Sequence, residues 1–100
     1  MTLVYAPRAR QDIAEIFDAV ALHSPSAAHR IEDAIRLNCE RLADFPRSAV
    51  ATDQPGVRRL PVVRYPYAIF YRVGAVREDV EIVRVVHSSR LKDLHRLPED

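Results

Sequence analysis

The segment GVRRLPVVRYPYAIFYRV, residues Gly56 to Val73, is mainly apolar, and β-branched and aromatic residues recur along it. Such residues favour strands. A second stretch of the same character, VEIVRVVH, follows after the short connection GAVRED, which has the length of a hairpin loop. The sequence therefore predicts three strands in the C-terminal half: Val57 to Val63, Tyr67 to Val73 and Val80 to His87.

The N-terminal half has a helical pattern. A short strand, Thr2 to Tyr5, precedes Pro7, and proline is well suited to the first turn of a helix. The apolar residues that follow recur at positions i, i+3, i+4 and i+7, which places them on one helical face: Ile13, Ile16, Phe17 and Val20. On this pattern Asp12, Glu15 and Asp18 are expected on the solvent-exposed face.

A second helix is expected to begin at Pro25, with Ser24 as its N-cap, and to close at Phe45-Pro46. Its inward stripe contains Ala28, Ile31, Ile35, Asn38 and Leu42. The link between the two helices is so short that they must form an antiparallel hairpin. Residues 46–56 begin with Pro46, end with Pro55-Gly56 and show no hydrophobic period, so they are expected to form a loop.

These elements give the order β-α-α-β-β-β. The predicted fold is α+β, with a small, antiparallel-rich sheet packed against a two-helix hairpin. A chain of 100 residues is large enough for one hydrophobic core and too small for two, so residues 1–100 are expected to be one domain.

The composition excludes several function classes. The apolar runs are short and interrupted by arginine, so no membrane segment is expected, and no secretion signal is recognisable. The single cysteine, Cys39, cannot form an internal disulfide, which favours a cytoplasmic location. Histidine spacing predicts no metal site, and the two glycines form no phosphate-binding loop, so no cofactor is expected.

The net charge of +1 conceals an asymmetry along the chain. Residues 1–56 carry six arginines and eight acidic residues, whereas residues 57–96 carry eight arginines, one lysine and four acidic residues. Arginine pairs bidentately with carboxylates and phosphates. The C-terminal half is therefore expected to meet an anionic partner.

The order of elements, the SPSAAHRI segment that opens the second helix, the arginine-rich GVRRLPVVRYPYAIFYRV segment and VEIVRVVHSSR together resemble the RelE/ParE superfamily of prokaryotic toxins. The likeness runs from about Tyr5 to Arg90. Within the superfamily the sequence is more similar to the ParE branch, because its third strand contains YPY and a histidine ends its fourth strand.

The resemblance implies the toxin of a type II toxin–antitoxin pair, with no catalysis of its own. Such a toxin is expected to trap DNA gyrase, to form a hetero-oligomer with a cognate acidic antitoxin, and to need no sequence-specific nucleic-acid binding of its own. We expect the basic sheet to contact antitoxin or target through Arg58, Arg59, Arg72, Arg84, His87 and Arg90.

The alternative within the superfamily is a RelE-like, ribosome-dependent mRNA endonuclease. Metal-free RNA cleavage needs an acid, a base and cations around the phosphate. The candidate residues are His87, Arg84 and Arg59. Strand alternation places Glu81, Val83, Val85 and His87 on one face and Arg84 on the other, which argues against a joint role for His87 and Arg84. A third possibility is a relic that still binds antitoxin but is no longer toxic.

The segment SSRLKDLHRL after the last strand has leucines at i, i+3 and i+6. A last helical turn here would align Leu91, Leu94 and Leu97 as a small apolar stripe, either on the chain's own sheet or at a partner.

Overall fold

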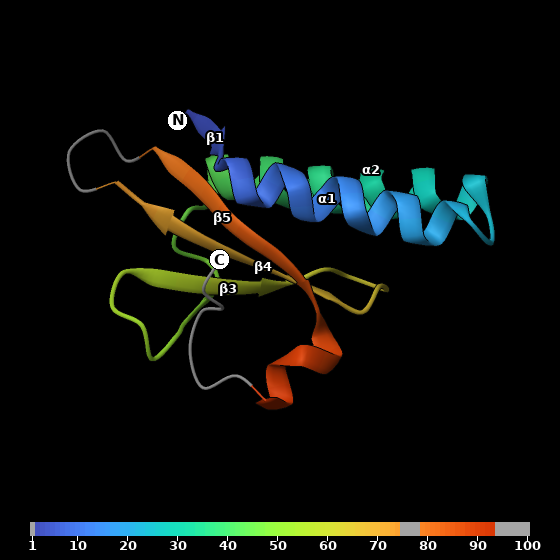
Figure 1. The fold of residues 1–100 in the computed structure, drawn as a ribbon. Coiled ribbons are helices and arrows are strands. Elements are labelled where there is room, and N and C mark those ends of the chain that lie inside the picture. Colours follow the sequence, from blue (N-terminus) through green and yellow to red (C-terminus); the bar gives the residue numbers. More distant parts are fainter. Residues whose placement is uncertain (1, 75–78, 94–100) are drawn as a thin grey trace.

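The computed structural model describes residues 2–74 and 79–93, and it confirms the predicted architecture: two helices pack on one face of a mixed sheet of five strands (Figure 1). The strand order is β1-β5-β4-β3-β2. The central strands β3 (Val57–Pro61), β4 (Tyr67–Val73) and β5 (Val80–His87) pair antiparallel, and β1 (Leu3–Tyr5) pairs parallel with β5. None of the described helices combines the length and the apolar character needed to cross a membrane.

Helix α1 (Pro7–Ala21) begins at the predicted proline, and helix α2 (Pro25–Asp44) begins with the predicted cap. The hydroxyl of Ser24 accepts a hydrogen bond from the backbone N–H of Ala27 at 3.2 Å, which satisfies one of the free donors at the helix start. The two helices run side by side and antiparallel above the sheet (Figure 1).

The predicted stripes of both helices face the sheet. All five expected residues of α2 are buried, as is Ile13 of α1, while the other apolar residues of the α1 stripe are half-buried. Most of these residues pack with one side of the central strands into a helix-side core, which includes Ile13, Ile31, Ile35, Leu42, Tyr67, Ile69, Tyr71, Ile82 and Val85. Burying this apolar surface is the main driving force that holds the helices on the sheet.

A smaller apolar cluster lies on the other face of the sheet. It consists of Val57, Ala68, Phe70 and Val86, with Val83 and Leu91 packed against it. Leu91 belongs to a short 3₁₀ helix, η1 (Ser88–Asp93), which follows β5. Leu94 and Leu97, which the sequence aligned with Leu91, lie outside the described residues.

One central strand is shorter than predicted, and one further strand was not predicted. Strand β3 ends at Pro61, so Val63 lies in the turn before β4 and is exposed. The turn contains Arg64 with φ 73°, a left-handed backbone conformation that ends the extended run. A further short strand, β2 (Val50–Ala51), pairs with Arg58 and Arg59 of β3. The sequence did not predict it, because two residues are too few to show a period.

The predicted alternation along β5 is wrong, because the pairing of β4 with β5 shifts between Phe70 and Tyr71. Phe70 pairs with Arg84 and Tyr71 with Ile82, so one residue of β5 is extra, as in a β-bulge. Val85 therefore packs in the helix-side core, whereas Val83 packs against the outer cluster. A bulge changes which side chains share a face, and strict alternation cannot anticipate it.

The bulge coincides with a buried ion pair that joins α1 to β5. Arg84 donates from Nε to Asp12 Oδ2 at 2.7 Å and from Nη2 to Asp12 Oδ1 at 3.2 Å. Asp12 Oδ2 also accepts the backbone N–H of Val85 at 2.9 Å. Strand β1 pairs only with Val80–Ile82 of β5. Beyond the end of β1, the Asp12 carboxylate accepts the hydrogen bond from the β5 backbone.

The expectation that Asp12 lies on a solvent-exposed face is therefore wrong. Its exposed fraction is 5%, and that of Arg84 is 2%. The carboxylate can be buried because a bidentate guanidinium and a backbone N–H satisfy it, and Arg8 Nε lies 3.6 Å from Oδ1. Glu15 and Asp18 are exposed as predicted.

Removing one partner of this pair should destabilise the fold strongly, because it leaves the other charge buried without compensation. We expect Asp12→Ala to lower the free energy of unfolding by about 3–5 kcal/mol in urea denaturation. The double substitution Asp12→Leu with Arg84→Met should cost clearly less than the two single changes together.

Asp18→Ala, an exposed acid on the same helix, serves as the control and should stay within about 0.5 kcal/mol of the unmodified chain. A loss of under roughly 1 kcal/mol for Asp12→Ala would contradict a structural role for the pair, since surface ion pairs contribute that little.

Candidate binding site

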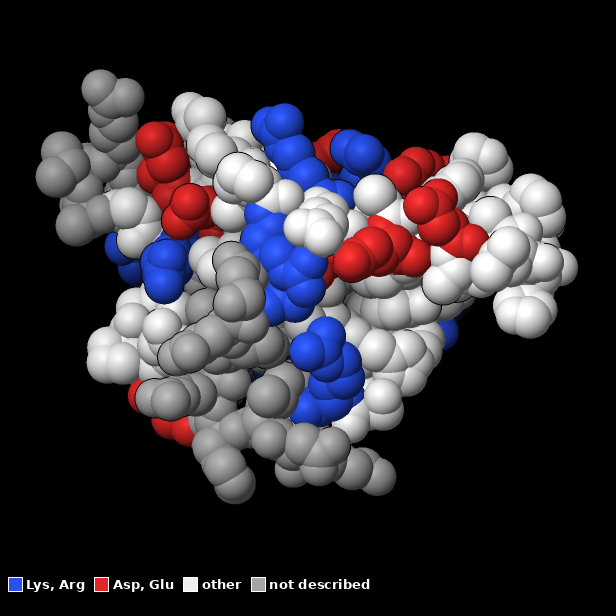
Figure 2. Space-filling model, viewed as in Figure 1, with Lys and Arg blue, Asp and Glu red and all other residues white. Residues whose placement is uncertain are grey.

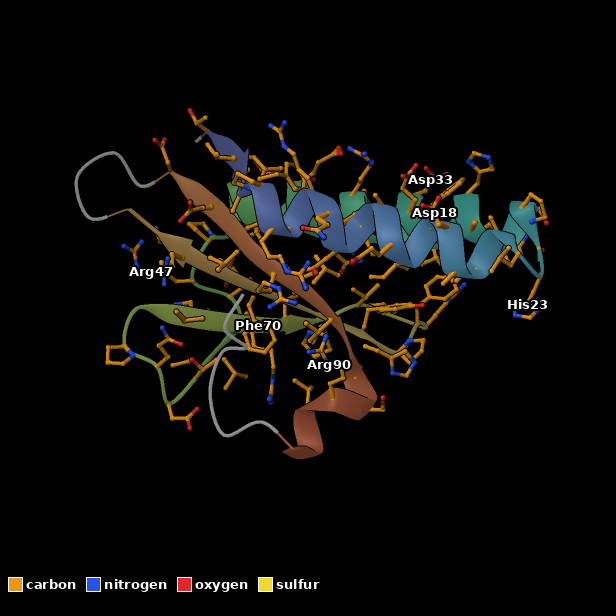
Figure 3. All side chains as sticks on the ribbon, in the orientation of Figure 1. Asp18, His23, Asp33, Arg47, Phe70 and Arg90 are labelled. Carbon is orange, nitrogen blue, oxygen red and sulfur yellow. The ribbon has the colours of Figure 1, made fainter. Side chains whose placement is uncertain are left out.

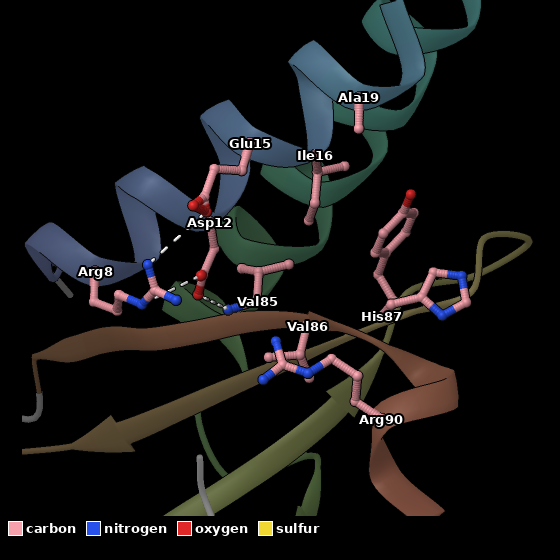
Figure 4. Close-up of a pocket in the computed structure, with 10 residues that line it drawn as sticks. Arg8, Asp12, Glu15, Ile16, Ala19, Val85, Val86, His87 and Arg90 are labelled. Atoms are coloured by element: carbon pink, nitrogen blue, oxygen red, sulfur yellow. Dashed lines mark hydrogen bonds and ion pairs between the residues drawn. The ribbon is translucent and has the colours of Figure 1, made fainter. Parts of the chain in front are cut away.

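A groove of about 280 Å³ lies between α1 and the end of β5 (Figure 4). We call it the α1–β5 groove. Helix α1 supplies one wall, and the end of β5 with its following turn supplies the other. Its lining consists of Arg8, Asp12, Glu15, Ile16, Ala19, Tyr67, Val85, Val86, His87 and Arg90.

The groove combines an apolar lining with charges on both sides. Ile16 and Ala19 come from α1, and Val85 and Val86 from β5. Arg8 Nη1 lies 3.9 Å from Glu15 Oε2, and Arg8 Nε lies 3.6 Å from Oδ1 of the buried Asp12. The Arg8 guanidinium therefore lies between two carboxylates of α1. Arg90 is exposed and extends back over β5 near Val86 (Figure 4). An apolar side chain flanked by a carboxylate would match this arrangement.

His87 stands at the end of the groove with an exposed ring. Its Nδ1 accepts the backbone N–H of Ser89 at 3.1 Å, and the Ser89 hydroxyl lies 2.8 Å from the same nitrogen. A backbone N–H can only donate, so the proton of the neutral ring is on Nε2. His87 therefore offers a donor on Nε2.

Tyr67 packs edge-on against His87, with ring centroids 5.4 Å apart and an interplanar angle of 81°. The two residues are cross-strand partners on β4 and β5. Burial raises the pKa of the Tyr67 hydroxyl, so it stays a neutral phenol at physiological pH. The aromatic contact and the Ser89 bond together restrain the His87 ring.

The six residues expected to form one basic surface lie in three places. Arg58 is half-buried on the helix side of the sheet, because its cross-strand partner is Tyr71 of the helix-side core. Its Nη1 donates to the backbone carbonyl of Ala49 at 2.8 Å. Arg58 thus stabilises the β2–β3 region.

Arg59 and Arg72 lie on the other face of the sheet. Their cross-strand partners are Phe70 and Val57, which both belong to the outer cluster. Arg72 Nη1 also lies 3.8 Å from Glu81 Oε1, and both side chains are about half exposed, so the pair is weak. These two arginines therefore flank the outer cluster.

Arg84 is not on the surface, which corrects its predicted placement. The sequence placed Arg84 on the basic surface that meets a partner, but next to the bulge its side chain binds Asp12 under α1. Only His87 and Arg90 of the predicted set meet at the α1–β5 groove. Figure 3 shows Arg90 at the sheet, while Asp18 and Asp33 project from the helices.

The proposed catalytic set His87, Arg84 and Arg59 does not converge. Arg84 is buried in its ion pair, and Arg59 lies on β3, two strands from His87 and three residues further along the sheet by pairing. Two strand spacings amount to roughly 10 Å, before the separation along the strands is added.

Sequence reasoning missed Arg8, Glu15 and Tyr67 as groove residues. The i, i+4 spacing of Arg8 and Asp12 was a visible signal of contact on one helix face, but nothing in the sequence placed that face over β5. Among the described side chains, no three of the types His, Cys, Asp or Glu lie close enough together to hold a metal ion.

The charges are arranged unevenly on the molecule. On the face in Figure 2, several acidic side chains lie along the helices and others lie at the edge of the sheet, while basic side chains lie on both the helical layer and the sheet. The charge difference between the two halves of the sequence therefore does not become a simple separation on this face.

The chain is similar in sequence to known toxins. Residues 3–92 match the family model described as the ParE toxin of the type II toxin–antitoxin system parDE. "Toxin RelE2" of Caulobacter vibrioides is 37% identical over 92 residues, which covers 89% of this chain and 97% of that protein.

Solved structures share the fold. A chain of the chromosomal ParDE toxin–antitoxin system from P. aeruginosa superimposes with a TM-score of 0.74 at 26% identity, covering 87% of this chain and 95% of that one. A chain of the toxin–antitoxin complex RelBE2 from Mycobacterium tuberculosis gives 0.61 at 22% identity, covering 86% and 95%.

Proposed function

Because the chain belongs to the ParE toxin family of type II toxin–antitoxin systems, within the RelE/ParE superfamily, we propose that it acts by binding DNA gyrase, without catalysis of its own. We propose further that the antitoxin neutralises this toxin by docking an acidic, partly apolar segment of its own in the α1–β5 groove. The toxin class follows from the family; the target and the docking site are the proposal.

One observation carries the non-catalytic mechanism. The basic residues that a RelE-like cleavage would draw from the sheet are separated: Arg84 is neutralised beneath α1, and Arg59 faces away from His87. Phosphodiester cleavage needs its acid, base and cations around one phosphate. A surface that offers separated arginines and an apolar groove suits binding better than catalysis.

The docking proposal rests on complementarity. Antitoxins of this class are expected to be acidic and to fold on contact, and a groove with an apolar lining and Arg90 at its edge suits such a segment. The apolar anchor would supply most of the affinity, and the carboxylates would supply orientation and a faster encounter.

A specific observation keeps the nuclease alternative in view. One relative is named Toxin RelE2, and the groove that holds His87 and Tyr67 is also lined by Glu15 and Arg90. These groups include a proton donor, a carboxylate and a cation. The nuclease alternative would use this set in place of His87, Arg84 and Arg59.

Induction of the protein without antitoxin distinguishes the two targets. We expect growth arrest with filamentation and a DNA-damage response, because stalled gyrase complexes break the chromosome. Transcript 5′ ends mapped over the same time course should show no early cleavage. Ribosome-positioned mRNA cleavage that precedes the damage response would refute gyrase as the target.

His87 tests whether the groove is catalytic. In a non-catalytic toxin, His87→Ala should change the induction level needed for growth arrest by only a few-fold. Loss of a general acid or base would cost about 10²–10⁴ in rate. Abolished toxicity in a variant that still folds and binds antitoxin would therefore favour the nuclease.

The groove itself can be blocked on one helix face. Ala19→Trp should fill the groove and weaken antitoxin binding at least tenfold, about 1.4 kcal/mol, in isothermal calorimetry. Arg90→Ala should cost about 1 kcal/mol or less, with more loss at low salt than at high salt, since the side chain is exposed.

Ala14→Trp is the matched control, because Ala14 is exposed on the same helix and does not line the groove. Asp18→Ala controls for helix charge; Asp12 cannot serve, since it is buried. If Ala14→Trp weakens binding as much as Ala19→Trp, the antitoxin does not dock in this groove.

A further inference from the structure

A second pocket, of about 340 Å³, lies on another side of α1. We call it the basic pocket. It is lined by Tyr5 of β1, Arg10 and Ile13 of α1, and Arg36 of α2. At about 100° per residue, Arg10 and Ile13 project well away from the helix side that lines the α1–β5 groove. The basic pocket is therefore separate from the proposed antitoxin site.

The two arginines of the basic pocket have little compensation. Among the described residues, no ion pair or hydrogen bond engages the side chain of Arg10, which is exposed. Arg36 Nη2 lies 4.0 Å from Glu32 Oε2 on its own helix, and the Arg36 side chain is 53% exposed. A pair that long and that solvated contributes little. Both guanidinium groups can therefore accept an anion.

The wall of the basic pocket carries no negative charge of its own. Burial raises the pKa of the Tyr5 hydroxyl, and the neighbouring Cys39 raises it further. Burial likewise raises the pKa of Cys39 to about 11. Both groups are neutral at pH 7. The charge of Arg36 lowers the pKa of both groups, whereas the exposed carboxylate of Glu40 raises it.

The dimensions and chemistry indicate the class of ligand. Two guanidinium groups from two helices match a doubly charged anion better than a singly charged one, and their planar N–H pairs match phosphate oxygens. Water occupies about 30 Å³ per molecule in the liquid, so the pocket has room for more than a phosphate group. Ile13 offers an apolar surface to whatever carries the phosphate.

We propose that the basic pocket binds a phosphate dianion, either the free ion or a small phosphomonoester. The ligand would bridge α1 and α2 next to β1 and so tie three elements together. This site is independent of the antitoxin groove and of the toxin's target.

The full-length chain, labelled with ¹⁵N, provides the test. Inorganic phosphate, adenosine 5′-monophosphate and acetate are each titrated at pH 7.5 and constant ionic strength set with chloride. Both phosphates should give saturable chemical-shift changes at the pocket residues, and acetate should bind at least tenfold more weakly. Tighter binding of the monophosphate identifies an ester as the ligand, and equal binding identifies the free ion.

Variants separate the site from general charge. Arg36→Gln and Arg10→Gln should each weaken phosphate binding about tenfold, whereas Arg30→Gln, an exposed arginine of α2 outside the pocket, should change it less than twofold. Circular dichroism checks that each variant is folded. Binding should also weaken at pH 5, where a phosphate monoester with a second pKa of about 6 loses its second charge.

Three results would overturn the proposal. The first is acetate binding as tightly as phosphate, the second is unchanged binding in Arg36→Gln, and the third is a set of shift changes centred away from Tyr5, Arg10 and Arg36.

Discussion

The buried ion pair between Asp12 and Arg84 is the constraint on which the arrangement of the molecule depends. Apolar burial brings the helices to the sheet, but it specifies their position only loosely, since hydrophobic contacts have no direction. The bidentate guanidinium and the Val85 N–H define one position of α1 over β5. Strand β1 ends just before this point, and the bulge in β5 turns Arg84 towards α1. The α1–β5 groove is the space left beside this junction.

The same pair changes the meaning of the basic sheet. Arginines that look equivalent in the sequence have different roles in the structure. Arg84 stabilises the fold, and Arg58 donates a hydrogen bond to the Ala49 carbonyl. Arg59 and Arg72 flank an apolar cluster on the outer face. Of the six residues predicted to contact a partner, only His87 and Arg90 line the groove, where Arg8 of α1 adds a second guanidinium group. The charge available to a partner is thus smaller and more localised than the count of arginines indicates, because a buried, paired arginine presents no charge to a partner.

Helix α1 supports two separate surfaces. Residues spaced by three and four line the groove, while Arg10 and Ile13 face the basic pocket. Members of the RelE/ParE superfamily share this scaffold of a helical hairpin on a sheet, as the ParDE and RelBE2 structures show for the fold. Differences in target within such a scaffold must then arise from its surface side chains, since a fold alone does not set function.

The sequence alone determined the elements and their order, because each helix and the three long strands have a complete apolar period and clear end signals such as Ser24-Pro25. The same local information identified the superfamily. Only the tertiary structure decided which polar residues matter. The burial of Asp12 depends on a residue 72 positions away, and the place of Arg84 depends on a bulge. Neither leaves a local pattern, because contacts between distant segments form only when α1 and β5 pack together.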